Sequence, residues 1–165
     1  MRETHNTLPL IVREQSQALL NTHLAAAIDL HAQVKQAHWN VRGPGFIALH
    51  LLFDRVADAV ETFSDMLAER AGGLGGTAHG TIQMAVKRSY MVPYTLGLAH
   101  GDKHVFAVAA ALAAFGQAIT EAIRTTAEAG DPATADLLTE ILRGVDAQLW
   151  FVESNALAAT DPLAV

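Results

Sequence analysis

Apolar side chains recur with helical spacing over most of the chain, and the recurrence stops only at a few segments rich in glycine or proline. Apolar positions three and four residues apart lie on one face of a helix, so the pattern predicts helices over about residues 12–40 and 46–71. Residues 41–45 and 72–76 interrupt the pattern, because glycine and proline break helical continuity. The first half of the chain is therefore expected to form two long helices.

The second half predicts two further long helices after an irregular connection. Residues 77–101 carry no sustained helical pattern, apart from a short helix near 82–87. The next helices are expected over about 102–129 and 132–158. Their boundary carries residues typical of helix ends, namely Gly130, Asp131 and Pro132. The expected fold is all-α, a four-helix bundle whose long connection between the second and third long helices suggests a crossover.

The length of 165 residues and the absence of repeats or linkers indicate one domain. We expect it to span residues 1–165, with a short tail over 1–11 and another over 159–165. The longest apolar run, residues 105–116, is shorter than the roughly 20 residues of a membrane span, and no signal peptide is recognisable. The prediction is a soluble, cytoplasmic protein, with association with the nucleoid left open.

Charge and cysteine content narrow the possible functions. The chain has no cysteine, which excludes disulfides and thiolate metal sites, and its formal net charge is −6. Proteins that bind nucleic acids generally neutralise phosphates with Lys and Arg. Arg2 is the only basic residue among the first twelve. A general nucleic-acid-binding role is therefore not expected.

Four potential metal ligands lie on one stripe of the second predicted helix. His50 and Asp54 form one pair at a spacing of four residues, and Asp65 and Glu69 form a second pair at the same spacing. At about 100° per residue, all four fall within about 100° of arc around the helix. The two pairs therefore share a face.

One chain cannot bring both pairs to a single metal ion. Asp54 and Asp65 are about 16 Å apart along a helix, whereas a ligand atom binds a metal ion at roughly 2 Å. A second copy of the helix, packed antiparallel about a twofold axis near residues 58–61, places the first pair of one subunit opposite the second pair of its partner. The spacing predicts an intersubunit metal site, with two equivalent sites per dimer.

His38 joins this set if residues 41–45 fold the first two helices side by side. Two imidazoles and three carboxylates without sulfur suit iron, manganese or zinc by ligand type. From the residues alone, a solvated acidic helix face stays open as the alternative. No Glu is followed by His three residues later, which argues against the ligand pattern of larger ferritins and carboxylate oxidases.

Several segments resemble the signature of the Dps family, the miniferritins of the ferritin-like superfamily. The resemblance covers nearly the whole chain from about residue 15. It is carried by residues 35–43 with His38 and Trp39, by Phe46, Leu49, His50, Phe53 and Asp54, by residues 65–70 with Asp65 and Glu69, by Leu74–Gly76 with Gly80 and Thr81, and by residues 150–155.

The resemblance implies a ferritin-like subunit of a hollow homo-oligomer, a dodecamer in this family. Such proteins oxidise Fe(II), usually with hydrogen peroxide rather than oxygen, store ferric iron inside, and so protect DNA from oxidative damage. The implied ferroxidase ligands from one subunit are His38, His50 and Asp54. The twofold partner supplies Asp65 and Glu69.

The resemblance also suggests roles outside the ligand set. Trp39 is expected beside the centre, where it is a candidate redox residue, although packing at a helix end is the alternative. Carboxylates near the start of the last helix line ion pores in this family. The candidates here are Asp131, Asp136 and Glu140, of which Asp131 has an alternative role as a helix N-cap.

Departures from the family set the remaining expectations. Neither terminus carries a Lys-rich extension, and twelve subunits carry a formal charge of about −72, so direct DNA binding is not expected. A shell without ferroxidase activity and a zinc or manganese binder remain the alternatives. The other histidines lack partners at ligand spacing and are expected at the surface or in loops: His5, His23, His79, His100 and His104.

Overall fold

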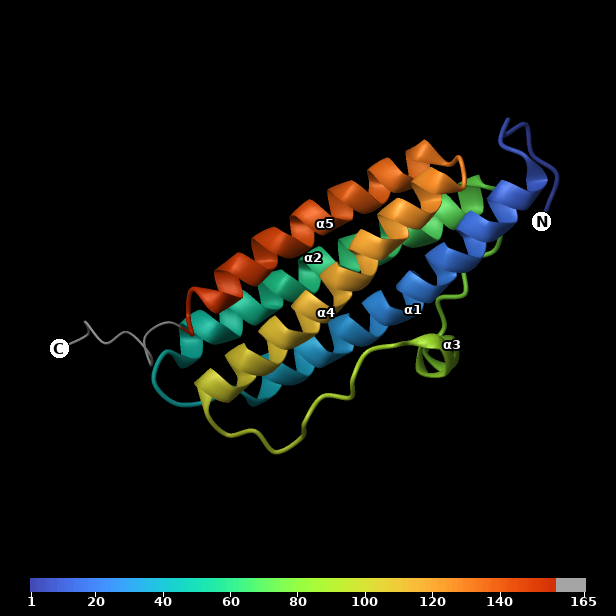
Figure 1. The fold of residues 1–165 in the computed structure, drawn as a ribbon. Helices are drawn as coiled ribbons and strands as arrows, with labels where there is room; N and C mark the ends of the chain where they lie inside the picture. The colour runs from blue at the N-terminus through green and yellow to red at the C-terminus, as the bar shows by residue number, and fades with distance from the viewer. Residues whose placement is uncertain (157–165) are drawn as a thin grey trace.

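The computed structural model describes residues 1–156, so the predicted C-terminal tail over 159–165 lies outside the described residues. Four long helices lie alongside one another and a short helix lies beside them (Figure 1). No strand occurs in the described part of the chain. The helices are α1 (Leu10–Asn40), α2 (Phe46–Gly73), α3 (Ile82–Arg88), α4 (Gly101–Glu128) and α5 (Pro132–Glu153). The predicted all-α four-helix bundle is confirmed.

The chain order explains the long connection between α2 and α4. Short turns join α1 to α2 and α4 to α5, and each of these pairs packs side by side. The end of α2 and the start of α4 lie at opposite ends of the bundle (Figure 1). The connection therefore crosses the length of the bundle and carries α3 against α1. This is the predicted crossover.

The turn between α1 and α2 depends on two glycines. Gly43 and Gly45 have φ angles of 93° and 78°, in the left-handed region where a Cβ atom is unfavourable. The reversal is tight enough to bring the end of α1 beside the start of α2. This turn positions His38 and His50 beside each other.

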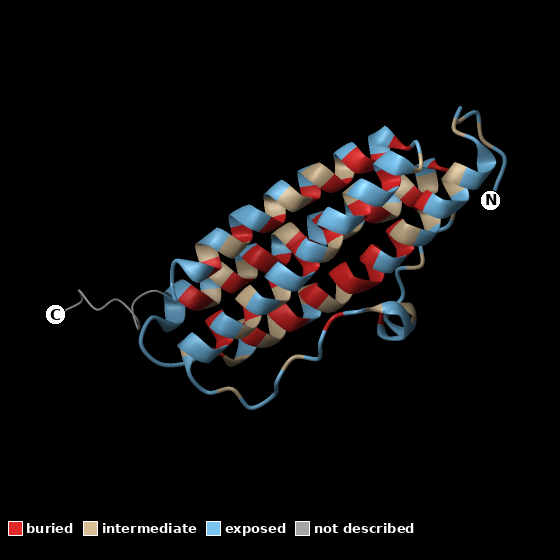
Figure 2. Ribbon diagram, viewed as in Figure 1, coloured by how far each residue is buried: buried red, intermediate tan, exposed pale blue. Residues whose placement is uncertain are grey.

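Buried residues occur along the whole length of the four long helices (Figure 2), and most of them are apolar. Phe53 and Phe115 are fully buried, together with leucine, isoleucine, valine and alanine side chains from the four long helices. Burial of each large apolar side chain stabilises the fold by roughly 1.5–3 kcal/mol. Tertiary packing rather than intrinsic propensity therefore accounts for most of the helical stability.

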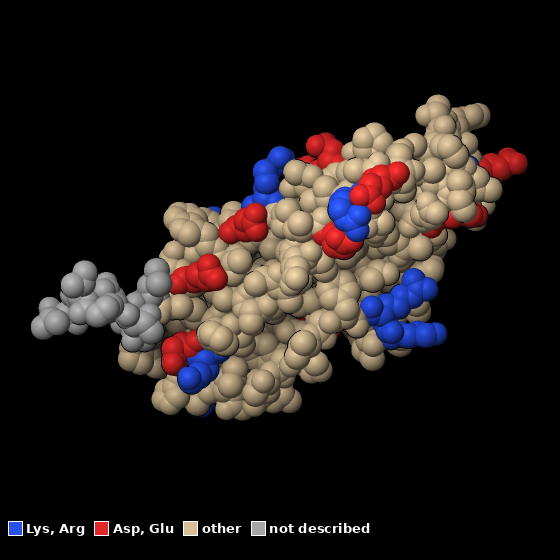
Figure 3. Space-filling model, viewed as in Figure 1, with Lys and Arg blue, Asp and Glu red and all other residues tan. Residues whose placement is uncertain are grey.

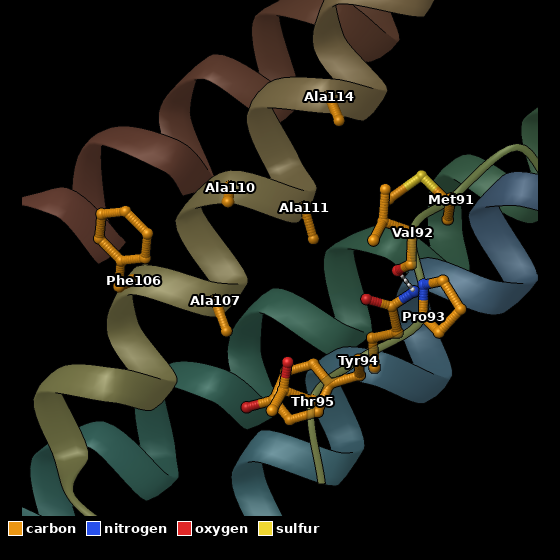
Figure 4. Close-up of a pocket in the computed structure, with 11 residues that line it drawn as sticks. Met91, Val92, Pro93, Tyr94, Thr95, Phe106, Ala107, Ala110, Ala111 and Ala114 are labelled. Carbon is orange, nitrogen blue, oxygen red and sulfur yellow. Dashed lines mark hydrogen bonds between the residues drawn. The ribbon is translucent and has the colours of Figure 1, made fainter. Parts of the chain in front are cut away.

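Alanines on α4 leave space beside the crossover. A pocket of about 360 Å³ lies between residues 91–95 of the crossover and α4, where Ala107, Ala111 and Ala114 are among the lining residues (Figure 4). α4 is also the one helix among residues 1–156 that is long and apolar enough to cross a membrane, with a mean hydropathy of 1.6 over its most apolar window. In this fold it packs against α5 and α1 as a bundle helix.

The last helix is shorter than predicted. α5 ends at Glu153, whereas the sequence pattern predicted an end near residue 158. The Ser154 hydroxyl donates a hydrogen bond to the carbonyl of Trp150 over 2.7 Å, and the Asn155 amide donates one to the carbonyl of Phe151 over 2.8 Å. Ser and Asn side chains compete with the backbone in this way, which favours the end of a helix.

Candidate metal centre

His38 and His50 lie face to face where α1 and α2 meet at the glycine turn. Their rings are stacked, with centroids 3.8 Å apart and planes inclined by 20°. His38 Nδ1 lies 2.7 Å from the carbonyl oxygen of His50, and His50 Nδ1 lies 3.0 Å from the carbonyl oxygen of His38. A carbonyl only accepts hydrogen bonds, so each Nδ1 carries the proton and donates it. Nε2 is thus the nitrogen of each ring that is left to bind a metal ion.

Asp54 lies one turn after His50 on α2 and is held by Lys35 of α1. Lys35 Nζ is 2.5 Å from Asp54 Oδ1, and the same oxygen is 3.8 Å from His38 Nδ1. The hydrogen bond from Lys35 is the main cause that lowers the pKa of Asp54, and the nearby histidines contribute further. Asp54 is therefore a carboxylate anion that lies beside the ammonium group of Lys35 and the imidazole of His38.

Asp65 and Glu69 lie further along α2 and are exposed. Asp65 borders a surface groove of about 330 Å³, together with His31 of α1 and Glu61 of α2. No three imidazole or carboxylate groups among residues 1–156 of one chain converge closely enough to hold a metal ion. The fold thus brings His38, His50 and Asp54 to one end of α2 and leaves the second predicted pair apart, so the intersubunit site stays a prediction.

Trp39 follows His38 near the end of α1 and is 66% exposed. Lys35 Nζ is 5.9 Å from the centroid of its ring. The indole is therefore not packed into the core of the subunit. Packing at the helix end was the alternative to a redox role beside the metal centre. Its redox role stays a prediction.

The three pore candidates separate into two groups. Asp131 is fully buried at the start of α5, where it accepts hydrogen bonds from the main-chain N–H of Thr134 over 3.0 Å and from Arg70 over 2.8 Å. Burial raises the pKa of Asp131, but the hydrogen bonds from Thr134 and the charge of Arg70 outweigh it and leave the pKa below its usual value. Because this carboxylate is enclosed within the subunit, we do not propose Asp131 as a pore residue. Asp136 and Glu140 are exposed on α5.

Two histidines that were expected at the surface are buried, which corrects that prediction. His23 is 7% exposed, with Nδ1 3.0 Å from the Tyr90 hydroxyl, and His104 is 1% exposed. His104 Nε2 donates to the carbonyl of Leu98 over 3.1 Å, so its Nδ1 accepts from the Tyr94 hydroxyl over 2.6 Å. Both tyrosines belong to the crossover, whose path the sequence pattern does not reveal.

Lys35 is the residue near the centre that the sequence analysis missed. It precedes His38 by three residues and Trp39 by four, so the three side chains lie on one face of α1. Its partner Asp54 is 19 residues away along the chain, on the other side of the glycine turn. Lysine is a poor metal ligand in its charged form, and only the folded turn shows that its ammonium group reaches the carboxylate.

Comparisons with known proteins agree with this fold. The family model of the ferritin-like domain matches residues 17–156. The DNA protection during starvation protein of Agrobacterium fabrum is 37% identical over 153 residues, which cover 93% of this chain and 94% of that protein. Among solved structures, DpsC from Streptomyces coelicolor superposes with a TM-score of 0.90 at 30% identity, covering 99% of this chain and 94% of that one. DpsA14 from the same organism gives a TM-score of 0.86 at 34% identity, with 92% and 90% covered. The chain is therefore a member of the Dps family of ferritin-like proteins.

Proposed function

We propose that this protein is a ferroxidase that binds Fe(II) at centres shared by two subunits and stores the ferric product inside a hollow homo-oligomer, a dodecamer. The observation that carries the proposal is the reciprocal hydrogen bonding of His38 and His50 beside the ionised Asp54. It orients two imidazoles with free Nε2 atoms next to a carboxylate. Metal-binding histidines are commonly oriented in this way, by a hydrogen bond at the ring nitrogen that does not bind the metal ion.

The chemistry of the donor set fits iron as the substrate. The proposed ligands are His38, His50 and Asp54 from one subunit, with Asp65 and Glu69 from its twofold partner. Nitrogen and oxygen donors bind Fe(II), and the carboxylates also stabilise the higher charge of Fe(III). Each Fe(II) gives up one electron, so two Fe(II) ions and two protons reduce one hydrogen peroxide to two water molecules. Oxygen is the alternative oxidant.

Iron also has to pass the wall of the shell. Asp136 and Glu140 are exposed and four residues apart on α5, so they share one face of that helix. We propose that they line an entry pore where copies of this helix meet. Their negative charge favours the approach of divalent cations.

The proposed protection of DNA is indirect and operates in the cytoplasm. Consumption of Fe(II) and peroxide removes the reagents that form hydroxyl radicals. The formal charge of −6 per chain opposes contact with phosphates, and the face drawn in Figure 3 shows only scattered basic side chains. We expect no retardation of duplex DNA by the oligomer in a gel mobility assay at 150 mM salt.

The test is an anaerobic titration of the metal-free oligomer with Fe(II), followed by peroxide while ferric absorbance is recorded. The expected result is saturable binding of about two ions or ion pairs per dimer, followed by rapid oxidation. His50→Ala and Asp65→Ala should abolish both, whereas His5→Ala, a change at an exposed residue, should leave both intact.

Oxidation no faster than in buffer would contradict the proposal and favour a shell without ferroxidase activity. Tight binding of zinc or manganese with no response to Fe(II) would instead favour a binder of those metals at the same residues. Activity that survives both substitutions would place the chemistry elsewhere in the protein.

A further inference from the structure

The pocket between the crossover and α4, called the crossover pocket below, is a preformed space within the subunit. Its volume of about 360 Å³ lies in the range of roughly 300–1,000 Å³ that is typical of small-molecule sites. Ala107, Ala111 and Ala114 point from α4 toward residues 91–95 (Figure 4). Larger side chains at these positions would fill the space, so the alanines keep the pocket open.

Gln33 of α1 supplies a buried polar group to this pocket. Its side chain borders the pocket although the residue is only 6% exposed. Its Nε2 donates hydrogen bonds to Asp29 Oδ1 over 3.1 Å and to the carbonyl of Val92 over 3.0 Å. Both amide hydrogens are thus used, and the orientation of the amide is fixed, because the reverse orientation would place its oxygen against two acceptors.

The oxygen of Gln33 is left as an acceptor. Among residues 1–156, no side chain or main-chain N–H donates a hydrogen bond to Gln33 Oε1. An amide oxygen in a largely buried side chain gains free energy from any donor that enters the space beside it. The crossover pocket therefore favours a molecule that carries a hydrogen-bond donor.

The rest of the lining favours a neutral aromatic body. No charged side chain occurs among the described residues that line the pocket, so a charged ligand would lose its hydration without gaining a partner. The Tyr94 hydroxyl donates to His104 Nδ1 over 2.6 Å, which fixes the ring of Tyr94 and leaves its hydroxyl hydrogen unavailable to a ligand. Phe106 of α4 also borders the pocket. Aromatic side chains pack favourably against a flat ring.

We propose that the crossover pocket binds a neutral phenol, whose hydroxyl donates to Gln33 Oε1 while its ring packs between Tyr94 and the alanines of α4. None of the five proposed iron ligands lines this pocket. The site is thus separate from the candidate metal centre, and the proposal does not depend on ferroxidase activity.

The test is equilibrium dialysis of naphthol, a fluorescent phenol that is neutral at pH 7, against the wild-type oligomer. The expected result is saturable binding of one molecule per subunit. Methoxynaphthalene has the same rings but no donor, and it should bind about tenfold more weakly. Ala111→Leu fills the pocket and should abolish saturable binding of naphthol. Ala113→Leu makes the same change at an exposed position of α4 that does not line the pocket, and it should bind as wild type.

The role of Gln33 is tested separately by Gln33→Met, which removes the acceptor and keeps a side chain of similar length. This variant should bind naphthol and methoxynaphthalene with equal affinity. Equal affinity of the two compounds for wild type would overturn the role of Gln33 Oε1, whether or not the variant folds. Uptake of naphthol that does not saturate, or that survives in Ala111→Leu, would overturn the site itself.

Discussion

At the level of single residues, His23 links the stability of the bundle to pH. Burial lowers the pKa of His23 from 6.5 to about 4. His23 takes up a proton near pH 6.5 in the unfolded chain but only near pH 4 in the folded chain. The contribution of His23 to stability is therefore greatest above pH 6.5 and declines as the pH falls toward 4. Between pH 7.5 and pH 5, this single group is expected to lower the free energy of unfolding by about 2 kcal/mol.

Urea unfolding at both pH values, at one fixed protein concentration, measures this effect. His23→Leu, which keeps an apolar side chain in the buried site, should lose about 2 kcal/mol of the pH dependence. His5→Leu should keep all of it, because His5 is exposed. An unchanged pH dependence in His23→Leu would mean that the buried imidazole is not the group that titrates.

Residue roles could be predicted from sequence only where the partners lie on one helix or on a recognisable motif. The stripe with His50 and Asp54 follows from helical spacing, and a place for His38 beside it follows once the glycine turn is assumed. The contacts of His23 and Lys35 join segments that are 67 and 19 residues apart. No periodicity relates such positions, so their roles depend on the folded chain.

At the level of helices, the start of α5 depends on Asp131. This residue caps the N-terminus of α5 by accepting a hydrogen bond from the main-chain N–H of Thr134. It also forms an ion pair with Arg70 of α2, so it links α5 to α2. Asp131→Ala removes the cap and leaves Arg70 without its anion, which should lower the free energy of unfolding by about 3 kcal/mol. Asp131→Asn retains a capping oxygen and should cost less.

Thermal unfolding of both variants beside Asp136→Ala measures this prediction. Asp136 is exposed, so its replacement should change stability by no more than about 0.5 kcal/mol. Equal stability of the Asp131 and Asp136 variants would contradict the structural role of Asp131 and return it to the candidates for the pore.

The contact between α5 and α2 requires a glycine. A Cβ atom on Gly144 would lie 2.6 Å from Phe63 Cζ, which is closer than carbon atoms approach. Gly144→Ala should therefore destabilise the bundle by about 1–2 kcal/mol despite the better helix propensity of alanine. Gly72→Ala in α2 has open space around the new methyl group and should stabilise by up to about 1 kcal/mol. Thermal unfolding that ranks the two variants in the opposite order would contradict this packing.

Helix ends show where sequence-based prediction works and where it fails. The boundary at Gly130 and Asp131 was predicted correctly, because a glycine with a φ angle of 87° follows α4 and an aspartate caps α5. The end of α5 was predicted too late, because apolar periodicity continues beyond Glu153. There the side chains of Ser154 and Asn155 donate hydrogen bonds to carbonyls of the preceding turn. These bonds compete with the backbone hydrogen bonds of the helix, and the spacing of apolar residues does not reveal them.

At the level of the whole molecule, four of the five proposed ligands lie on one long helix. α2 extends from Phe46 to Gly73, with the first pair near its start and Asp65 and Glu69 closer to its end. A rigid helix cannot bend these groups together. The proposed ferroxidase centre therefore requires a second copy with antiparallel α2, and the isolated subunit is expected to be inactive.

Subunit mixing tests this requirement directly. His50→Ala and Asp65→Ala chains each break both centres of their own homodimer. In a mixed dimer, one centre receives both altered residues, while the other receives His50 and Asp65 intact from opposite chains. Dissociation of the two variants, mixing in equal amounts and reassembly should thus restore about one quarter of the wild-type ferroxidase rate, since half of the dimers are mixed and each has one intact centre. Mixing a single variant with itself controls for the reassembly step. If the five ligands came from one chain, the mixture would stay as inactive as its components, and the shared centre would have to be abandoned.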